Sequence, residues 1–202
     1  MKYLELFCGT KSFSNVIPNM TSVDIDPKMK PDILGDIMEL DYKSLWDPEE
    51  FYYIHASPPC TDYSKINNSH PNKVLRLDYY DSVVKRTLEI IDYLKPKYWT
   101  MENPQTGTLK DRPFMKELDL SYFDIDYCRY DYPYRKRTRF WSNIEFGDRC
   151  CRGKGECVMM VGGRHMKSCG NGHSRYGGCV QLHKKYSVPP LFVEELYKNI
   201  LP

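Results

Sequence analysis

Residues 51–60 read Phe-Tyr-Tyr-Ile-His-Ala-Ser-Pro-Pro-Cys, an apolar run that ends at two prolines and a cysteine. A short apolar run bounded by breakers is typical of a buried strand. Pro58 and Pro59 carry no backbone N–H, so they cannot extend the hydrogen-bond ladder of a sheet, and the chain must leave the sheet in an extended form. The sequence therefore places Cys60 just beyond the carboxyl end of a strand, where we expect it to act as a catalytic nucleophile.

Strand-like and helix-like segments alternate on both sides of this stretch. Apolar residues recur at helical spacing between residues 77 and 94 and stop before Pro96, which predicts an amphipathic helix packed on the sheet. Further patterns predict strands at 2–7, 20–25, 32–34, 98–101, 121–130 and 138–142, and short helices at 12–17, 113–118 and 189–201. The alternation indicates an α/β sheet whose late strands run antiparallel, with an irregular Gly- and Cys-rich excursion at 145–180.

The composition is that of one globular domain with a small appendage. The chain has 202 residues, of which 41% are hydrophobic and 28% charged, and no apolar run approaches the length of about 20 residues that a membrane span needs. It opens without a signal-peptide pattern, so we expect a protein that is kept inside a cell. Because thiols stay reduced there, the eight cysteines favour chemistry or metal binding over disulfides.

The net charge of +2 hides an uneven distribution. Residues 129–193 carry 13 Lys and Arg against 4 Asp and Glu, so the rest of the chain is acidic. Between residues 157 and 193 there is no carboxylate side chain, although five Lys or Arg and three His occur. Such a basic stretch fits a polyanionic partner such as nucleic acid. The alternative is a basic surface that is merely solvated.

Three predicted strands end in turns that carry reactive or permissive residues: Cys8-Gly9-Thr10, Pro58-Pro59-Cys60 and Glu102-Asn103-Pro104. The carboxyl ends of parallel strands border the ligand crevice of an α/β sheet, so we expect the three turns to share one site. Asp24, at the end of the next strand, is placed to accept hydrogen bonds from ribose hydroxyls. The alternatives are an ordinary strand-to-helix turn at Gly9 and a buried, unreactive thiol at Cys60.

Five segments form a larger set in fixed order: Leu6-Phe7-Cys8-Gly9, Pro58-Pro59-Cys60 with Ser64, Met101-Glu102-Asn103-Pro104, Arg137-Thr138-Arg139 and Ser187-Val188-Pro189. This set resembles five motifs of the cytosine-C5 DNA methyltransferases, and in particular their short phage and large-virus type. The resemblance implies a Rossmann-like class I methyltransferase sheet with helices on both faces and a small Cys-rich insertion. It also implies an S-adenosylmethionine-binding catalytic core at 1–142, a reduced Cys-rich basic recognition segment at 143–184, and a C-terminal helix at 185–202 that returns to the core.

The resemblance implies transfer of a methyl group from S-adenosylmethionine to C5 of cytosine in DNA. Cys60 is expected to attack C6 of the base while Glu102 contacts N3 and the exocyclic amine, which makes C5 nucleophilic. Arg139 is expected to contact the base and to help hold the catalytic thiolate, with Arg137 on the backbone or the wall of the active site. The implied substrate-binding residues are Ser64, Asn103 and Pro104.

The implied cofactor site draws on both ends of the chain. Its residues are Phe7, Gly9 and Thr10 on the methionine side, Asp24 at the ribose, Ile25 at the adenine face, Asp36 at the adenine amine, and Pro58, with Ser187 and Val188 closing the site. The target carbon is stacked inside a duplex, so the cytosine must be flipped out. We expect the loop 61–76 to act as the clamp, through Lys65, His70, Lys73 and Arg76.

Several positions depart from the family pattern. Lys11-Ser12 replaces a further glycine, Ile25 replaces a large aromatic residue, Lys185-Tyr186 replaces Gly-Asn, and Arg135 stands where glutamine is common. We therefore expect an altered affinity for the cofactor. The stretch between Arg139 and Ser187 is far shorter than the recognition region of family members with defined sites, which predicts short or lax specificity. Sequence-neutral phosphate contacts are expected from Arg149, Arg152, Lys154, Arg164 and Arg175.

The Cys-rich segment has too few apolar residues to form a core of its own. Tetrahedral thiolate and imidazole ligation of a structural zinc ion could fold it. The candidate ligands are Cys151, Cys157, His165 and either Cys150 or Cys169. Because the spacings match no tight CxxC knuckle, unligated thiols are the alternative.

Two other functions stay open from the sequence. The same chemistry could act on RNA or on a free cytosine nucleotide, which the short recognition segment favours. A non-catalytic nucleic-acid-binding protein is the second alternative, which the departures around the cofactor site favour. The resemblance further implies duplex DNA as partner, no membrane, and the cytoplasm of a bacterial host or of a virus-infected cell. The sequence carries no signal for an oligomeric state.

Overall fold

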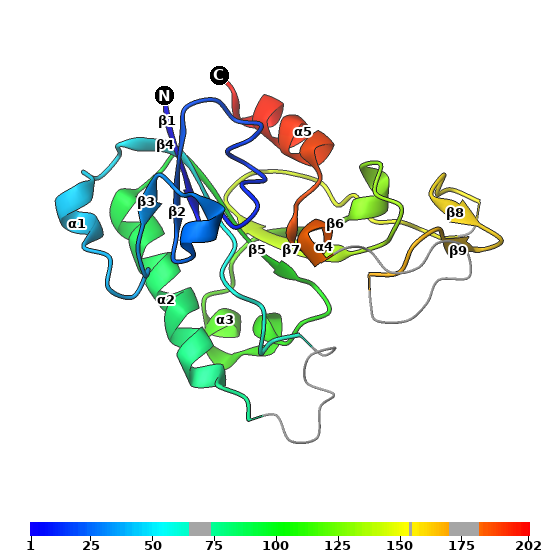
Figure 1. Ribbon diagram of the computed structural model, residues 1–202, viewed down its shortest axis with the longest axis horizontal. Helices are drawn as coiled ribbons and strands as arrows, with labels where there is room; N and C mark the ends of the chain where they lie inside the picture. Colours follow the sequence, from blue (N-terminus) through cyan, green and yellow to red (C-terminus); the bar gives the residue numbers. More distant parts are fainter. Residues whose placement is uncertain (65–73, 154, 170–181) are drawn as a thin grey trace.

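The computed structural model describes residues 1–64, 74–153, 155–169 and 182–202. Within them a seven-stranded sheet has the order β3-β2-β1-β4-β5-β7-β6, and a two-stranded β8-β9 hairpin lies to one side of it (Figure 1). The first five strands pair in parallel, whereas β7 runs antiparallel to both β5 and β6. The strands are β1 (Lys2–Leu6), β2 (Met20–Asp24), β3 (Ile33–Leu34), β4 (Phe51–Ala56), β5 (Tyr98–Pro104), β6 (Tyr122–Asp126), β7 (Arg137–Ser142), β8 (Met160–Val161) and β9 (Arg164–His165).

Helices cover both faces of the sheet, as the sequence predicted (Figure 1). The α-helices are α1 (Tyr42–Leu45), α2 (Leu77–Leu94), α3 (Pro113–Glu117), α4 (Leu182–Tyr186) and α5 (Pro190–Ile200), and the 3-10 helices are η1 (Pro27–Met29), η3 (Leu109–Asp111) and η4 (Tyr127–Arg129). Among the described helices none is long and apolar enough to cross a membrane. The short helices α1 and α4 were not predicted.

Two hydrophobic layers hold the sheet, one on each face. Leu4 belongs to the layer formed with α2, whereas the adjacent Tyr3 belongs to the layer that contains Phe192 of α5. Neighbouring residues of a strand point to opposite faces, which is how β1 serves both layers. Burial of one large apolar side chain contributes about 1.5–3 kcal/mol, so the central strands, and the turns at their ends, are firmly fixed.

Strand β5 is longer than predicted. The expected break at Glu102 is wrong, because Glu102, Asn103 and Pro104 pair with Phe140, Arg139 and Thr138 of β7. Pro104 is accommodated because it is the last residue of the strand, where the missing N–H interrupts little of the ladder. Conversely, β6 ends at Asp126, four residues earlier than expected, and the chain turns into η4.

The helix predicted at 12–17 is wrong as well, since residues 9–16 form consecutive turns. Lys11 has a φ of 57°, which interrupts a right-handed helix. The buried carboxylate of Glu5 accepts hydrogen bonds from the backbone N–H groups of Phe13 and Ser14 and from the Ser14 hydroxyl. Tertiary contacts to the end of β1 therefore replace regular helical bonding in this segment.

Candidate active site

The three predicted turns do share one cavity, at the carboxyl ends of β1, β4 and β5. Its volume is about 320 Å³. Lining residues from the first turn are Cys8, Gly9 and Thr10, from the second Pro58, Pro59 and Cys60, and from the third Glu102 and Pro104, with Lys136, Tyr186 and Val188 added from later in the chain. A hollow of about 560 Å³ lies elsewhere, between α2 and Trp99, and contains none of the residues predicted for the site.

Cys60 is half-buried on a turn that the neighbouring strands hold in place. The amide of Asn103 donates to the backbone carbonyl of Pro58 at 3.0 Å, and the carbonyl of Cys60 accepts from the N–H groups of Tyr63 and Ser64. Burial raises the pKa of the Cys60 thiol and the Glu102 carboxylate raises it further, whereas the Lys136 ammonium lowers it. The thiol is thus protonated at rest and needs help to become a nucleophile.

Glu102 is buried beside Cys60 and has unused hydrogen-bonding capacity. Within the described residues, neither its Oε2 atom nor the Oδ1 atom of Asn103 has a hydrogen-bond partner. Burial raises the pKa of Glu102, while Lys136 and the Ser57 hydroxyl lower it. A buried polar atom without a partner is costly, so the Oε2 atom of Glu102, which lines the cavity, indicates a site that a polar ligand completes.

His55, for which the sequence suggested no role, supports this wall of the cavity from within β4. Its Nε2 atom lies 2.8 Å from the Ser57 hydroxyl and its Nδ1 atom 2.8 Å from the Thr100 hydroxyl. Burial lowers the pKa of His55, so the ring is neutral. Its ring also stacks on Phe13 at 3.5 Å between centroids. His55 thereby fixes Ser57 next to Glu102.

Lys136 is the main residue of the cavity that the sequence did not predict. Its Nζ atom donates to the carbonyl of Lys185 at 3.0 Å and to the hydroxyl of Tyr127 at 3.3 Å. Burial lowers the pKa of Lys136, but Tyr127, Glu102 and Cys60 together raise it more, so the side chain is charged. The signal in the sequence was its position next to the Arg137-Thr138-Arg139 motif.

Arg137 and Arg139 do not line this cavity. Arg137 pairs with Asp126 at 2.6 Å and Arg139 pairs with Asp124 at 2.8 Å, both across the β6–β7 ladder. Arg139 lies opposite Asn103 in the register, and side chains alternate along a strand, so Arg139 and Glu102 point to opposite faces of the sheet. The contact expected between Arg139 and the thiolate is therefore absent from this structure.

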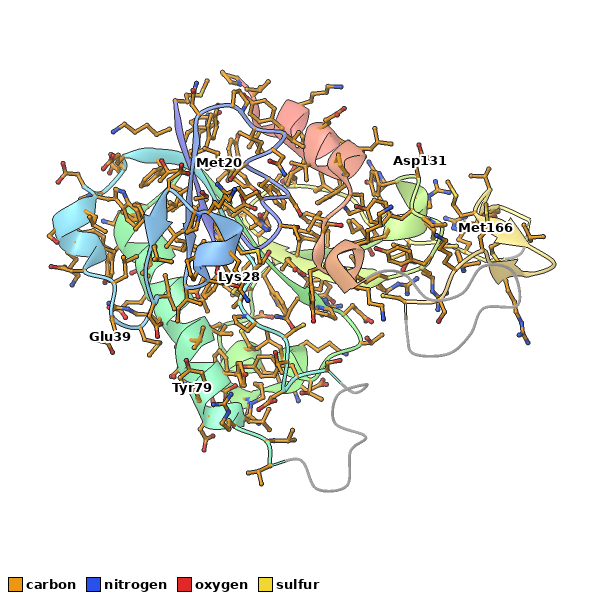
Figure 2. All side chains as sticks on the ribbon, viewed as in Figure 1. Met20, Lys28, Glu39, Tyr79, Asp131 and Met166 are labelled. Carbon is orange, nitrogen blue, oxygen red and sulfur yellow. The ribbon has the colours of Figure 1, made fainter. Side chains whose placement is uncertain are left out.

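A smaller cavity of about 80 Å³ adjoins the first and shares Phe7, Asp24, Ile25 and Pro59 with it. Its other lining residues are Val23, Gly35, Asp36, Ile37, Tyr79 and Val83, of which Tyr79 is labelled in Figure 2. The structure thus brings the predicted Asp24, Ile25 and Asp36 together in one mixed apolar and acidic pocket.

Asp24 also shapes the turn after β1. Its Oδ2 atom accepts from the N–H of Gly9 at 2.8 Å, and its Oδ1 atom accepts from the N–H of Asp26 at 2.9 Å. Gly9 has a φ of 46° and Phe7 a φ of 58°, which gives the sharp bend that opens the cavity. Each carboxylate oxygen keeps a free lone pair for a ligand hydroxyl.

The C-terminal part of the chain closes the cavity through Val188 rather than Ser187. The N–H of Val188 donates to the hydroxyl of Ser12 at 2.9 Å, and its side chain is buried. The Ser187 hydroxyl instead donates to the carbonyl of Lys184 and lies 3.0 Å from the hydroxyl of Tyr132. Of the two predicted residues, only Val188 lines the site.

The structure tests only part of the predicted nucleic-acid contacts. Lys65, His70, Lys73, Lys154 and Arg175 lie outside the described residues. Arg76 directly precedes α2; its N–H donates to Asp62 at 2.7 Å, and its guanidinium lies near the Tyr79 and Tyr80 rings. Arg149 pairs with Glu195 at 3.2 Å, while Arg152 and Arg164 are exposed.

The structure brings three of the predicted metal ligands close together. Cys151, Cys157 and His165 lie together, but Cys128 of η4 takes the fourth place expected for Cys150 or Cys169. Cys150 points at the carbonyl of Asp124, at 3.6 Å, and Cys169 packs against the hydrophobic layer under α5. Cys128 was missed because the sequence assigned it to a strand.

The order of the sheet, the antiparallel β7 and the acidic pocket beyond β1 and β2 define a class I methyltransferase fold. A solved structure described as a DNA modification methyltransferase encoded within a prophage (E. coli) has a similar fold, with a TM-score of 0.51 and 14% identity. The match covers 70% of this chain, which spans about half (46%) of that one.

The frog virus 3 (isolate Goorha) protein named "Probable DNA (cytosine-5)-methyltransferase" is 34% identical over 219 aligned residues, covering 97% of this chain and 98% of the viral protein. No family model matches the chain. At this identity and coverage, the chain belongs to the DNA (cytosine-5)-methyltransferase family.

Proposed function

We propose that this protein transfers a methyl group from S-adenosylmethionine to C5 of cytosine in DNA through a covalent bond between Cys60 and C6 of the base. The observation that carries the proposal is the convergence of Cys60, Glu102 and Lys136 on one cavity that continues into the acidic pocket at Asp24. The division of the chain into a core at 1–142, a recognition segment at 143–184 and a returning helix at 185–202 is part of the same proposal.

The residues of the smaller cavity suit the cofactor. Asp24 and Asp36 offer carboxylate acceptors for ribose hydroxyls and for an adenine amine, and Ile25, Ile37 and Val83 offer apolar surface for the ring. Phe7, Gly9, Thr10 and Val188 then border the larger cavity on the side of the reacting group. When bound, S-adenosylmethionine supplies an electrophilic methyl group.

Glu102 is the group that activates the base. Because burial raises its pKa, it can hold a proton and donate a hydrogen bond to N3 of cytosine, while Oε2, unpartnered among the described residues, accepts from the exocyclic amine. Stabilising charge at N3 makes C6 electrophilic. A protonated Glu102 also no longer raises the pKa of Cys60 by repulsion, so the same proton favours the thiolate.

Cys60 is the nucleophile. Its thiolate adds to C6, which places electron density on C5, and C5 then takes the methyl group. A base removes the proton from C5, the C6–S bond breaks, and the thiolate leaves. The same carbon has lost a proton and gained a methyl group, so the charges balance and Cys60 is regenerated.

Lys136 supplies the positive charge that the resemblance assigned to Arg139. Its ammonium lowers the pKa of both Cys60 and Glu102, so it stabilises the thiolate before attack and the carboxylate after proton donation. Arg137 and Arg139 serve instead to neutralise Asp126 and Asp124 on β6. These two ion pairs hold β6 and β7 in register, and this register positions Lys136 at the cavity.

The target cytosine must leave the duplex to reach C6, since Cys60 lies within a cavity rather than on a protruding element. Exposed Arg152 and Arg164 on the Cys-rich segment offer phosphate contacts that carry no sequence information. This arrangement supports weak sequence discrimination.

Transfer of tritium from labelled cofactor to acid-precipitable DNA tests the proposal. Label should enter duplex DNA with the wild-type protein and with the matched variant Cys150→Ser, and should be lost with Cys60→Ser. Parallel reactions with tRNA and with dCTP identify the substrate class; the dCTP product is acid-soluble and is therefore separated by chromatography before counting. Greater transfer to either of these than to duplex DNA would contradict the DNA assignment, and undiminished transfer by Cys60→Ser would contradict the nucleophile.

A further inference from the structure

Four side chains with sulfur or imidazole ligand atoms converge beside η4, away from the catalytic cavity. The ligand atoms of Cys128, Cys151, Cys157 and His165 all lie within 4.8 Å of one another. His165 Nε2 is 3.7 Å from the sulfur of Cys151 and 3.5 Å from that of Cys157. In a tetrahedral zinc site, bond lengths of about 2.3 Å to sulfur and 2.0 Å to nitrogen put S and N about 3.5 Å apart. We propose that these four residues bind one structural Zn²⁺.

The chemistry of the donors selects this metal. Three thiols and one imidazole form a Cys₃His set, which suits zinc, whereas calcium and magnesium require oxygen ligands. The nearby carboxylate of Asp126 is already engaged, since its Oδ2 atom accepts from the N–H of Cys151 at 2.7 Å and from Arg137 at 2.6 Å. Asp126 thus fixes the backbone of one ligand without joining the set.

The segment that carries three of the ligands has little hydrophobic core of its own among its described residues. Of the described residues between 145 and 169, only Cys151 is buried. The β8–β9 hairpin has two residues in each strand and extends from the body of the protein, where Met166 marks it in Figure 2. A short hairpin is not stable alone in water, so the free energy of metal binding would act as its folding free energy.

The proposed metal site is connected to the catalytic cavity through two adjacent residues of the chain. Cys128 follows Tyr127, whose hydroxyl accepts from Lys136. The N–H of Lys167, two residues after β9, further donates to the carbonyl of Pro133 at 2.8 Å, which attaches the end of the hairpin to the segment 127–136. A bound metal therefore positions the turn from which Lys136 enters the cavity, while touching neither substrate nor cofactor.

Metal content of the purified protein tests the proposal independently of methyl transfer. Inductively coupled plasma mass spectrometry should find about one zinc ion per chain in the wild type. The matched pair is Cys157→Ser and Cys150→Ser, because Cys150 adjoins a ligand but lies outside the cluster. Zinc should be lost from Cys157→Ser and kept by Cys150→Ser. A wild type without zinc, or equal loss from both variants, would overturn the site.

A spectroscopic measurement on the wild-type chain avoids variants that fail to fold. Protein stripped of metal under reducing conditions and titrated with Co²⁺ should show thiolate-to-cobalt charge transfer and the intense ligand-field bands of tetrahedral cobalt, saturating at about one equivalent. Zn²⁺ should then displace the cobalt. Weak octahedral bands without charge transfer would refute the site.

Discussion

The catalytic edge of the sheet and the Cys-rich segment position reactive side chains by different means. At the catalytic edge, Cys60 follows β4 and Glu102 lies within β5, and both strands are buried between two hydrophobic layers. In the Cys-rich segment, only one described residue between 145 and 169 is buried, and ligand atoms take the place of a core. The first region should therefore tolerate loss of its reactive groups without unfolding, whereas the second should not.

The largest effect is expected for Cys60, the proposed nucleophile. Cys60→Ser should lower methyl transfer by at least about 10³-fold, because a hydroxyl is a far weaker nucleophile than a thiolate at neutral pH. The melting temperature should stay close to that of the wild type, since Cys60 is on a turn and not in either layer. Single-turnover transfer and calorimetry measure the two quantities. A variant that unfolds would break the contrast between the regions.

Removal of metal should have the next largest effect, and on the other region. Chelation should open the segment around Arg152 and Arg164 to trypsin and should lower its local opening free energy by about 3 kcal/mol or more. Strands β1 and β4 should keep their protection against hydrogen exchange, because their layers do not depend on the hairpin. Uniform loss of protection over the whole chain would show that the two regions are one folding unit.

Substitutions of Lys136 and Arg139 distinguish a positive charge that supports catalysis from one that supports stability. Lys136→Met should lower kcat by about 10 to 100-fold with little change in KM for DNA, and Lys136→Arg should restore part of it. Arg139→Met leaves Asp124 buried without its partner and should cost about 3–5 kcal/mol of stability. Its kcat per folded molecule should change much less. A large loss of kcat in Arg139→Met with little loss in Lys136→Met would instead assign the catalytic role to Arg139.

The pH dependence of Cys60 alkylation measures how the neighbouring charges change the pKa of the Cys60 thiol. Glu102 raises the pKa of the thiol, so Glu102→Gln should move the midpoint of iodoacetamide labelling to lower pH. Lys136 lowers that pKa, so Lys136→Met should move the midpoint to higher pH. Peptide mapping by mass spectrometry assigns the label to Cys60. Shifts of the same sign in both variants would contradict the geometry.

The smallest effect concerns the cofactor pocket. Ile25 lines both cavities and is 63% exposed, so a larger ring can be added there without displacing core residues. Ile25→Phe should tighten binding of S-adenosylmethionine by about 0.5–1.5 kcal/mol through stacking. Isothermal titration calorimetry measures the change. Weaker binding of S-adenosylmethionine by Ile25→Phe would indicate that the adenine ring does not lie against residue 25.

The parts of the fold that depend on local pattern were predictable. The apolar run at 51–56 and the helical spacing at 77–94 both became elements with the predicted bounds, because breakers on each side left no other choice. The break expected at Glu102 failed, because pairing with β7 extends β5 and such pairing is not visible in the local sequence. The shared cavity followed from topology alone.

The parts of the site that depend on register and distance in sequence were not predictable. Lys136 enters the cavity because the pairing of β5 with β7 decides which side of the strand faces Glu102. Cys128 joins its partners only after β6 has turned into η4. A sequence motif indicates candidate residues of a site. The alternation of side chains along each strand then decides which of these residues face the cavity.

The hydrogen bond from Val188 to Ser12 joins positions 176 residues apart. On the same face, the hydroxyl of Tyr52 donates to the carbonyl of Ile200, and Phe192 completes the layer over β4 and β7. A chain emerging from the ribosome therefore carries Cys60, Glu102 and Lys136 long before it has the wall that closes their cavity. We therefore expect a chain truncated before Val188 to lack this wall of the cavity and to transfer no methyl group.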